Sequence, residues 1–168
     1  MFDKAADLYR GRIKAGVTGG FFYYRMVHLE LARCAYDTAR GIAEEAMNQP
    51  QPDAWSHCAL AEAYLKSGNL SQARAICRKG IQDCGSLNRL YELLLETTEQ
   101  EGNEDEAIAE CRNWVDAMPG NGDAHVALAS RLLKRGKIDD ARQAVQTGKS
   151  LVPDWPALLE LAKQLKME

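Results

Sequence analysis

The sequence repeats itself with a period of about 34 residues, a length that is the signature of stacked supersecondary units. One position of the repeat carries glycine in three successive copies, Gly68, Gly102 and Gly136. Another position carries alanine in four copies, Ala39, Ala73, Ala107 and Ala141. Apolar residues follow helical spacing on both sides of each glycine, so the pattern predicts pairs of helices joined by a glycine turn.

The period also divides the chain, which we interpret as one domain over residues 1–168. Four full repeats are expected at residues 20–53, 54–87, 88–121 and 122–155. An orphan helix is expected over 2–15, because Ala5 lies one period before Ala39 and so belongs to the second helix of a repeat. A helix over 156–167, with one apolar and one polar face, is expected to cap the last repeat, since a repeat array must cover its end faces.

Three local features carry further expectations. Cys34 stands where the later repeats carry the turn glycine, so we expect this turn to be built differently. Asp53 and Ser71 are placed to act as N-caps of the helices that follow them. Gly80, Trp114 and Gly148 occupy one repeat position. We expect the two glycines to be needed for bare backbone, and Trp114 to fit because the same position carries no side chain in the neighbouring repeats.

Composition excludes several classes of protein. A net charge of −3 and a pI of about 5.7 argue against binding to phosphate backbones, so no nucleic-acid partner is expected. No apolar run approaches the ~20 residues of a membrane span, which argues against membrane insertion. The five cysteines are an odd number without a C-x-x-C pair, so we predict free thiols and a cytoplasmic location.

Residues for catalysis or metal binding do not form a recognisable pattern. Of the three histidines, His28 has no second metal-binding residue at helical spacing, and His57 and the adjacent Cys58 point in different directions on a helix. His57 and His125 share one repeat position, which indicates a structural role. The Gly16–Gly20 stretch matches no phosphate-binding motif. We therefore expect no enzyme activity, no metal and no cofactor.

The repeat resembles the tetratricopeptide repeat (TPR), whose pattern is W-x-x-L-G-x-x-Y, then A-x-x-x-F, then P. The second repeat matches with His57, Leu60, Ala61, Tyr64, Ala73 and Cys77. The third matches with Tyr91, Leu94, Leu95, Thr98, Ala107, Cys111 and Pro119. The fourth matches with His125, Leu128, Ala129, Leu132, Ala141, Val145 and Pro153. This resemblance implies an all-α, right-handed α-solenoid of helix-turn-helix repeats, closed by the C-terminal capping helix.

The same resemblance implies a non-catalytic protein–protein interaction scaffold that holds a peptide or partner domain in a concave groove. The groove residues expected from first-helix positions are Tyr24, Arg25, His28, Trp55, Cys58, Glu62, Arg89, Glu92 and Glu96. The third repeat has two arginines against nine acidic residues, and its glutamates stack at helical spacing on the groove helix. A partner with basic and apolar residues would relieve that repulsion.

Other functions stay open. Some TPR proteins clamp a peptide carboxylate with Lys, Asn and Arg, but this clamp is absent, so an adaptor for heat-shock protein tails is disfavoured. Compact TPR chains of this size also resemble chaperones of type III secretion, whose groove should be more uniformly apolar. RNA-binding helical repeats favour a basic channel, which is missing. The N-terminal end presents more apolar surface than one contact requires (Phe2, Leu8, Tyr9, Ile13 and 21–24), which predicts a self-assembling homo-oligomer or a missing segment of a longer protein.

Overall fold

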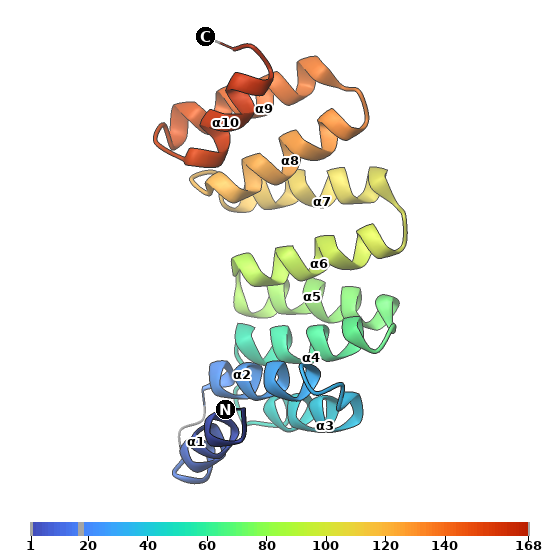
Figure 1. Ribbon diagram of the computed structural model, residues 1–168, viewed down its shortest axis with the longest axis vertical. Coiled ribbons are helices and arrows are strands. Elements are labelled where there is room, and N and C mark those ends of the chain that lie inside the picture. Colours follow the sequence, from blue (N-terminus) through green and yellow to red (C-terminus); the bar gives the residue numbers. More distant parts are fainter. Residues whose placement is uncertain (1, 17–18, 168) are drawn as a thin grey trace. The chain divides into compact units, whose positions relative to one another are not determined.

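The computed structural model describes residues 2–16 and 19–167, and within them the chain is α-helical without strands (Figure 1). Its helices are α1 (Phe2–Lys14), α2 (Gly20–Leu31), α3 (Tyr36–Met47), α4 (Ala54–Lys66), α5 (Leu70–Cys84), α6 (Asn88–Gln100), α7 (Glu104–Ala117), α8 (Gly122–Lys134), α9 (Ile138–Leu151) and α10 (Pro156–Gln164).

The helix starts follow the period of the sequence. The first helices of the repeats, which we call A helices, are α2, α4, α6, α8 and α10, and each starts one period after the previous one. The second helices, which we call B helices, are α1, α3, α5, α7 and α9, and their starts are spaced in the same way. The predicted all-α fold of helix-turn-helix repeats with a terminal helix packed on the last one is confirmed.

The chain forms two compact units. The N-unit, residues 1–101, contains α1 to α6, and the C-unit, residues 102–168, contains α7 to α10. The boundary falls within the third sequence repeat, between its A helix and its B helix.

Small side chains let the helices of the N-unit approach one another closely. Fully buried alanines, among them Ala39, Ala43, Ala59 and Ala73, lie in its core. Larger side chains from α6 fill the remaining space. They are Leu90, Leu93 and Leu94, which are buried as well. Alternating small and large residues give the interdigitated packing of a protein interior.

The core of the C-unit is built in the same way, with Ala129, Leu132 and Val145 buried on α8 and α9. Helix α10 packs on both of these helices and buries Leu158 and Ala162. Pro156 stands in its first turn, where a missing N–H leaves no hydrogen bond unmade.

The turn at Cys34 has the same conformation as the glycine turns. Cys34 has φ +58°, in the left-handed region that Gly68 also adopts with φ +81°. The backbone hydrogen bonds agree too: Cys34 N–H bonds to Leu31 O, as Gly68 N–H bonds to Leu65 O. The expectation of a different turn was wrong, because the hydrogen bonds of the turn outweigh the modest cost of a side chain in this conformation.

Gly80 and Gly148 are the points where three helices meet. A Cβ at Gly80 would lie 2.7 Å from His57 Cβ and 3.1 Å from Leu90 Cδ1. A Cβ at Gly148 would lie 2.9 Å from His125 Cβ and 2.8 Å from Leu158 Cδ1. Bare backbone is therefore required, as predicted. The A helices of the same and the next repeat leave no room for a side chain, and the expected volume trade with Trp114 stays a prediction.

Asp53 caps α4 as predicted, because its Oδ1 accepts a hydrogen bond of 2.9 Å from Ser56 N–H. Its Oδ2 also accepts a bond of 3.1 Å from Gly20 N–H at the start of α2, so one carboxylate serves two helix starts. The predicted cap at Ser71 was wrong. Helix α5 begins earlier, at Leu70, and its N-cap Asn69 makes no side-chain capping bond.

The cysteines of the chain are free thiols, with Cys58, Cys77 and Cys111 buried and Cys34 and Cys84 exposed. Among the described helices, none combines the length and the apolar character that crossing a bilayer demands.

Candidate partner-binding site

Three repeat positions of the A helices build one surface on the N-unit. The first position carries Phe21, Trp55 and Arg89, each one period from the next. The second carries Tyr24, Cys58 and Glu92, and the third carries His28, Glu62 and Glu96. Positions three and four apart share one face of a helix. Because α2, α4 and α6 pack side by side, the nine side chains form a grid, which we call the A-face.

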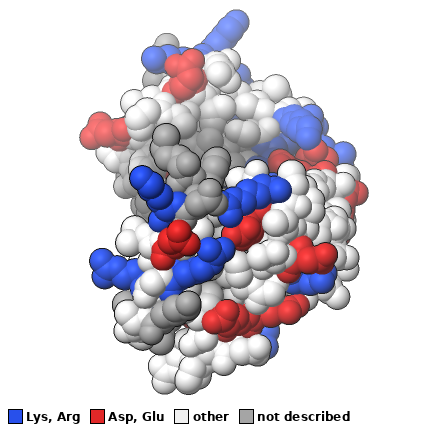
Figure 2. Space-filling view, turned by 60° about the horizontal axis from the view of Figure 1, so that its bottom comes forward, with Lys and Arg blue, Asp and Glu red and all other residues white. Residues whose placement is uncertain are grey.

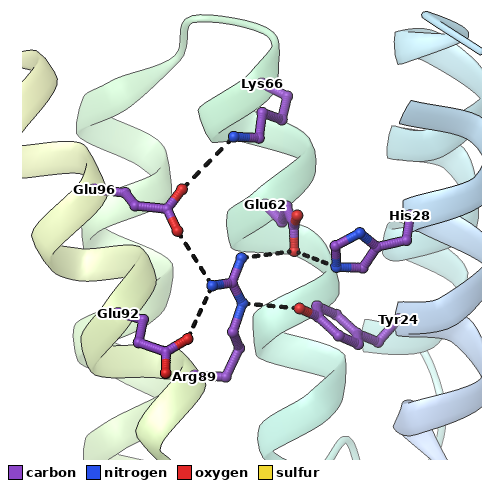
Figure 3. A network of polar contacts seen from close by, with 7 residues as sticks. All are labelled: Tyr24, His28, Glu62, Lys66, Arg89, Glu92 and Glu96. Atoms are coloured by element: carbon purple, nitrogen blue, oxygen red, sulfur yellow. Dashed lines mark hydrogen bonds and ion pairs between the residues drawn. The ribbon is translucent and has the colours of Figure 1, made fainter. Parts of the chain in front are cut away.

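Arg89 is the centre of a polar network on the A-face (Figure 3). Its Nε–H donates to Tyr24 OH at 2.8 Å. Its Nη1 contacts Glu92 Oε2 at 3.0 Å and Glu96 Oε1 at 3.2 Å, and its Nη2 lies 3.4 Å from Glu62 Oε2. The guanidinium thus joins all three A helices of the N-unit.

Glu62 is the buried member of this network, with 3% of its side chain exposed. Besides Arg89, His28 Nε2 lies 3.1 Å from Glu62 Oε2. Burial alone would raise the pKa of Glu62, but His28, Arg89 and Tyr24 together outweigh it and hold this pKa below its usual range. Glu62 is therefore a buried carboxylate that stays ionised at neutral pH.

The pKa values of the neighbouring groups shift in the direction that preserves the network. Burial, followed by the charge of Glu62, raises the pKa of Tyr24, so its hydroxyl stays protonated. Burial would lower the pKa of Arg89, but the glutamates and Tyr24 outweigh this effect and raise it. Glu62 and Arg89 therefore stay charged, and Tyr24 stays neutral, at neutral pH.

Aromatic rings continue the A-face from this network toward the N-terminal end. The Tyr24 ring lies 4.6 Å from the His28 ring and 5.0 Å from that of Trp55, measured between ring centroids. The Trp55 ring in turn lies 5.2 Å from that of Phe21, edge to face. Phe21 is exposed and Trp55 half-buried, so apolar ring surface remains available beside the charges.

A hollow of about 430 Å³ adjoins the network between α2, α3 and α4. Leu31, Ala32 and Tyr36 form its apolar side, and His28, Glu62 and Lys66 form its polar side. Lys66 Nζ lies 3.6 Å from Glu96 Oε2, so the same lysine belongs to the network and to the hollow.

Most of the residues predicted for the groove lie together here. Five of them lie on the A-face and are at least partly exposed: His28, Trp55, Arg89, Glu92 and Glu96. Tyr24 and Glu62 lie beneath them and are largely buried. Cys58 is placed at the centre of the grid but is fully buried, so it contributes packing and no surface. Arg25 is exposed on α2 and, among the described residues, has no ion-pair partner.

Two members of this surface were missing from the prediction, Phe21 and Lys66. The period could have found Phe21, which occupies the repeat position of Trp55 in the preceding copy. Helical spacing could have found Lys66, which is four residues after Glu62 on α4. The repulsion predicted among the glutamates of α6 is relieved within the chain, because Arg89 contacts Glu92 and Glu96 and Lys66 contacts Glu96.

On the face that Figure 2 shows, the described Lys and Arg side chains lie among Asp and Glu side chains. No cluster of three metal-binding side chains occurs among the residues that the structure describes. A second hollow, of about 460 Å³, lies in the C-unit among α7, α8 and α9.

Comparison with known proteins agrees with the repeat geometry. A family model described as "Tetratricopeptide repeat" matches residues 99–165. Residues 99–165 of this chain therefore consist of tetratricopeptide repeats. A comparison with curated protein sequences finds no match.

Solved structures of TPR proteins share the fold of this chain. TTC0263, a TPR protein of Thermus thermophilus, has a TM-score of 0.69 at 16% identity, with 98% of this chain and 90% of that chain covered. The MamA protein has a TM-score of 0.63 at 15% identity, covering 99% and 87%. YrrB, described as a TPR protein with an unusual peptide-binding site, has a TM-score of 0.60 at 15% identity, covering 96% and 84%.

Proposed function

We propose that this TPR protein is a non-catalytic scaffold that binds a peptide segment of a partner protein on the A-face of the N-unit. The observation that carries the proposal is the network of Tyr24, His28, Glu62, Arg89, Glu92 and Glu96 beside exposed aromatic rings. Aromatic anchors flanked by fixed charges are the arrangement that peptide recognition uses. The peptide-binding site in the description of YrrB supports the same role for the fold.

The chemistry of the A-face favours a partner segment with both basic and apolar residues. Three carboxylates, Glu62, Glu92 and Glu96, face only two permanent cations, Arg89 and Lys66. A basic side chain of the partner would balance the remaining charge at the exposed ends of Glu92 and Glu96. Phe21 and Trp55 would receive an apolar side chain next to it.

This mixture of groups also separates the proposal from a chaperone for secreted proteins. That class should have a more uniformly apolar groove than one in which Arg89 alone contacts three glutamates. A catalytic role has no support, because the ionisable groups of the network are engaged with one another rather than aimed at an open position.

A peptide-display selection with the full chain as bait tests the proposal. We expect selected peptides to share an apolar or aromatic residue next to Lys or Arg, and to bind less tightly as salt rises. The variant Glu92→Gln with Glu96→Gln should weaken these peptides several-fold and flatten the salt dependence. Trp55→Ala should weaken them while the helical circular dichroism stays unchanged.

A matched control makes the same change of two charges away from the A-face. Asp83→Asn on α5 with Glu160→Gln on α10 should leave peptide affinity unchanged, since both residues are exposed on other helices. If the two double variants weakened binding equally, the effect would come from net charge, and the A-face would lose its assignment.

A further inference from the structure

The two ends of the described chain are complementary halves of one repeat. Helix α10 begins one period after α8, so it is an A helix, and no B helix follows it among the described residues. Helix α1 begins one period before α3, so it is a B helix, and no described A helix precedes it. We infer that copies of this chain join head to tail, with α10 of one copy and α1 of the next forming a complete helical pair.

Helix α10 already sits on the preceding repeat as an A helix does. Leu158 on α10 packs against Gly148 on α9, as Leu90 on α6 packs against Gly80 on α5. Each leucine lies ten residues after its glycine. Because this docking is the same in both units, the opposite face of α10 is the face that a B helix covers in an interior repeat.

That face of α10 is uncovered at Leu159. The residues at the same repeat position, His57, Tyr91 and His125, are 2%, 3% and 1% exposed. For His57 and His125 the cover is the glycine of their own B helix. Leu159 has no such cover and is 38% exposed. An apolar side chain is thus exposed at a position that the repeat otherwise buries.

Helix α1 has a corresponding exposed apolar side chain at Leu8. Its equivalents in the following B helices are Ile42 and Ile76, which are partly buried, and Glu110 and Ala144, which are 7% and 8% exposed. Leu8 is 61% exposed. The inner side of α1 is packed normally, because Ala6 is buried and the Tyr9 ring lies 6.2 Å from that of Phe22 on α2. Leu8 is thus an exposed apolar side chain at a position that the later B helices bury at least in part. Phe2 and Ala5, which belong to the predicted apolar end, have side chains outside the described residues.

A second copy is the occupant that satisfies both faces at once, since the helix that each end lacks is present at the other end. The contact joins different surfaces of the two copies, so it does not close by itself in a dimer and extends into longer assemblies or a ring. This assembly is independent of the peptide-binding role, because Leu8 and Leu159 are outside the A-face.

Sedimentation velocity of the full chain over a range of concentrations tests the inference. We expect the wild-type chain to form a series of species whose mean mass rises with concentration. Leu8→Asp and Leu159→Asp should each be monomeric alone, because each removes one of the two surfaces. An equimolar mixture of the two variants should form a 1:1 dimer that grows no further, since one intact α10 face meets one intact α1 face.

The mixture also shows that both variants are folded, because an unfolded chain could not restore the contact. Leu151→Asp is the control: Leu151 is 50% exposed at the end of α9, and its change should leave the assembly intact. A wild-type chain that stays monomeric at millimolar concentration would overturn the inference and leave α1 for another partner or segment. A dimer that Leu8→Asp abolishes and Leu159→Asp does not would overturn it in favour of an α1–α1 contact.

Discussion

Replacing Arg89 by Met tests whether the polar network holds the N-unit together. Methionine keeps most of the aliphatic stem of Arg89 but removes the guanidinium that contacts Tyr24, Glu62, Glu92 and Glu96. Glu92 and Glu96 are partly exposed, so water replaces their lost partner at little cost. Glu62 has 3% of its side chain exposed, and it would keep His28 and Tyr24.

The expected loss of stability is about 3 kcal/mol at pH 7, because removing one partner of a buried ion pair costs roughly 3–5 kcal/mol and the remaining contact with His28 places Glu62 at the low end. The loss should shrink as the pH falls. In the wild type the pKa of Glu62 is held low, so its contribution is fully present above the unfolded pKa of ~4.3 and is lost only below it. Without Arg89 the pKa of Glu62 rises, because only His28 and Tyr24 then oppose the effect of burial, so protonation relieves the buried charge at a higher pH than in the wild type.

Urea unfolding at pH 7.5 and pH 5 measures both effects. Trp114 and Trp155 are changed to Phe in all samples, so that the fluorescence of Trp55 reports on the N-unit alone. Arg40→Met is the control, because Arg40 pairs with Asp37 and Glu44 on the exposed side of α3 and should cost less than ~1 kcal/mol. A loss below ~1 kcal/mol for Arg89→Met, the range of an exposed pair, or one equal at both pH values, would refute the argument.

Substitutions at three further positions, Gly80, Cys34 and Asp53, test the backbone of the repeat by the same unfolding measurement. Gly80→Ala should destabilise by ~1–3 kcal/mol, because a Cβ would lie 2.7 Å from that of His57, whereas Gly41→Ala, with nothing within 4 Å, should stabilise by ~0.5–1 kcal/mol. If both changed stability in the same direction, close packing would not be the reason for the glycine. Cys34→Gly should stabilise by roughly 0.5–1 kcal/mol, since φ +58° favours glycine, and a loss would mean that the cysteine side chain makes a needed contact. Asp53→Ala should cost ~1–2 kcal/mol, and Asp53→Asn less, because only the alanine removes the acceptor for both helix starts.

The periodicity of the sequence was sufficient to predict every helix pair, because helix starts that recur at a fixed interval need only local turns and apolar stripes to be recognised. It could not predict the conformation at Cys34. A residue without glycine's freedom stands there, and only the hydrogen bonds of the turn show that the backbone is the same. It also could not show why Gly80 is required, since His57 and Leu90 approach it from two other helices.

The candidate site was predicted as a set of residues but not as a network. The period identifies which A-helix positions are equivalent, and it therefore brings Tyr24 and Glu62 to one face. It does not show that Arg89 reaches back across α4 to Tyr24, 65 residues earlier. That contact depends on side-chain length and on how closely α2, α4 and α6 pack, and the repeat pattern specifies neither.

Like charges at equivalent repeat positions lie close together on the A-face. Equivalent positions on neighbouring A helices lie next to each other, so a repeat with identical residues at every copy would stack like charges. His28, Glu62 and Glu96 share one position, and Glu62 and Glu96 are kept compatible by Arg89 from another position and by Lys66. A partner that binds at Glu92 or Glu96 must therefore compete with Arg89 or Lys66 for the same carboxylates. A partner that offers only a single charge should therefore bind more weakly than a segment that also contacts Trp55 and Phe21. For this reason we expect selectivity to come from apolar contacts rather than from charge alone.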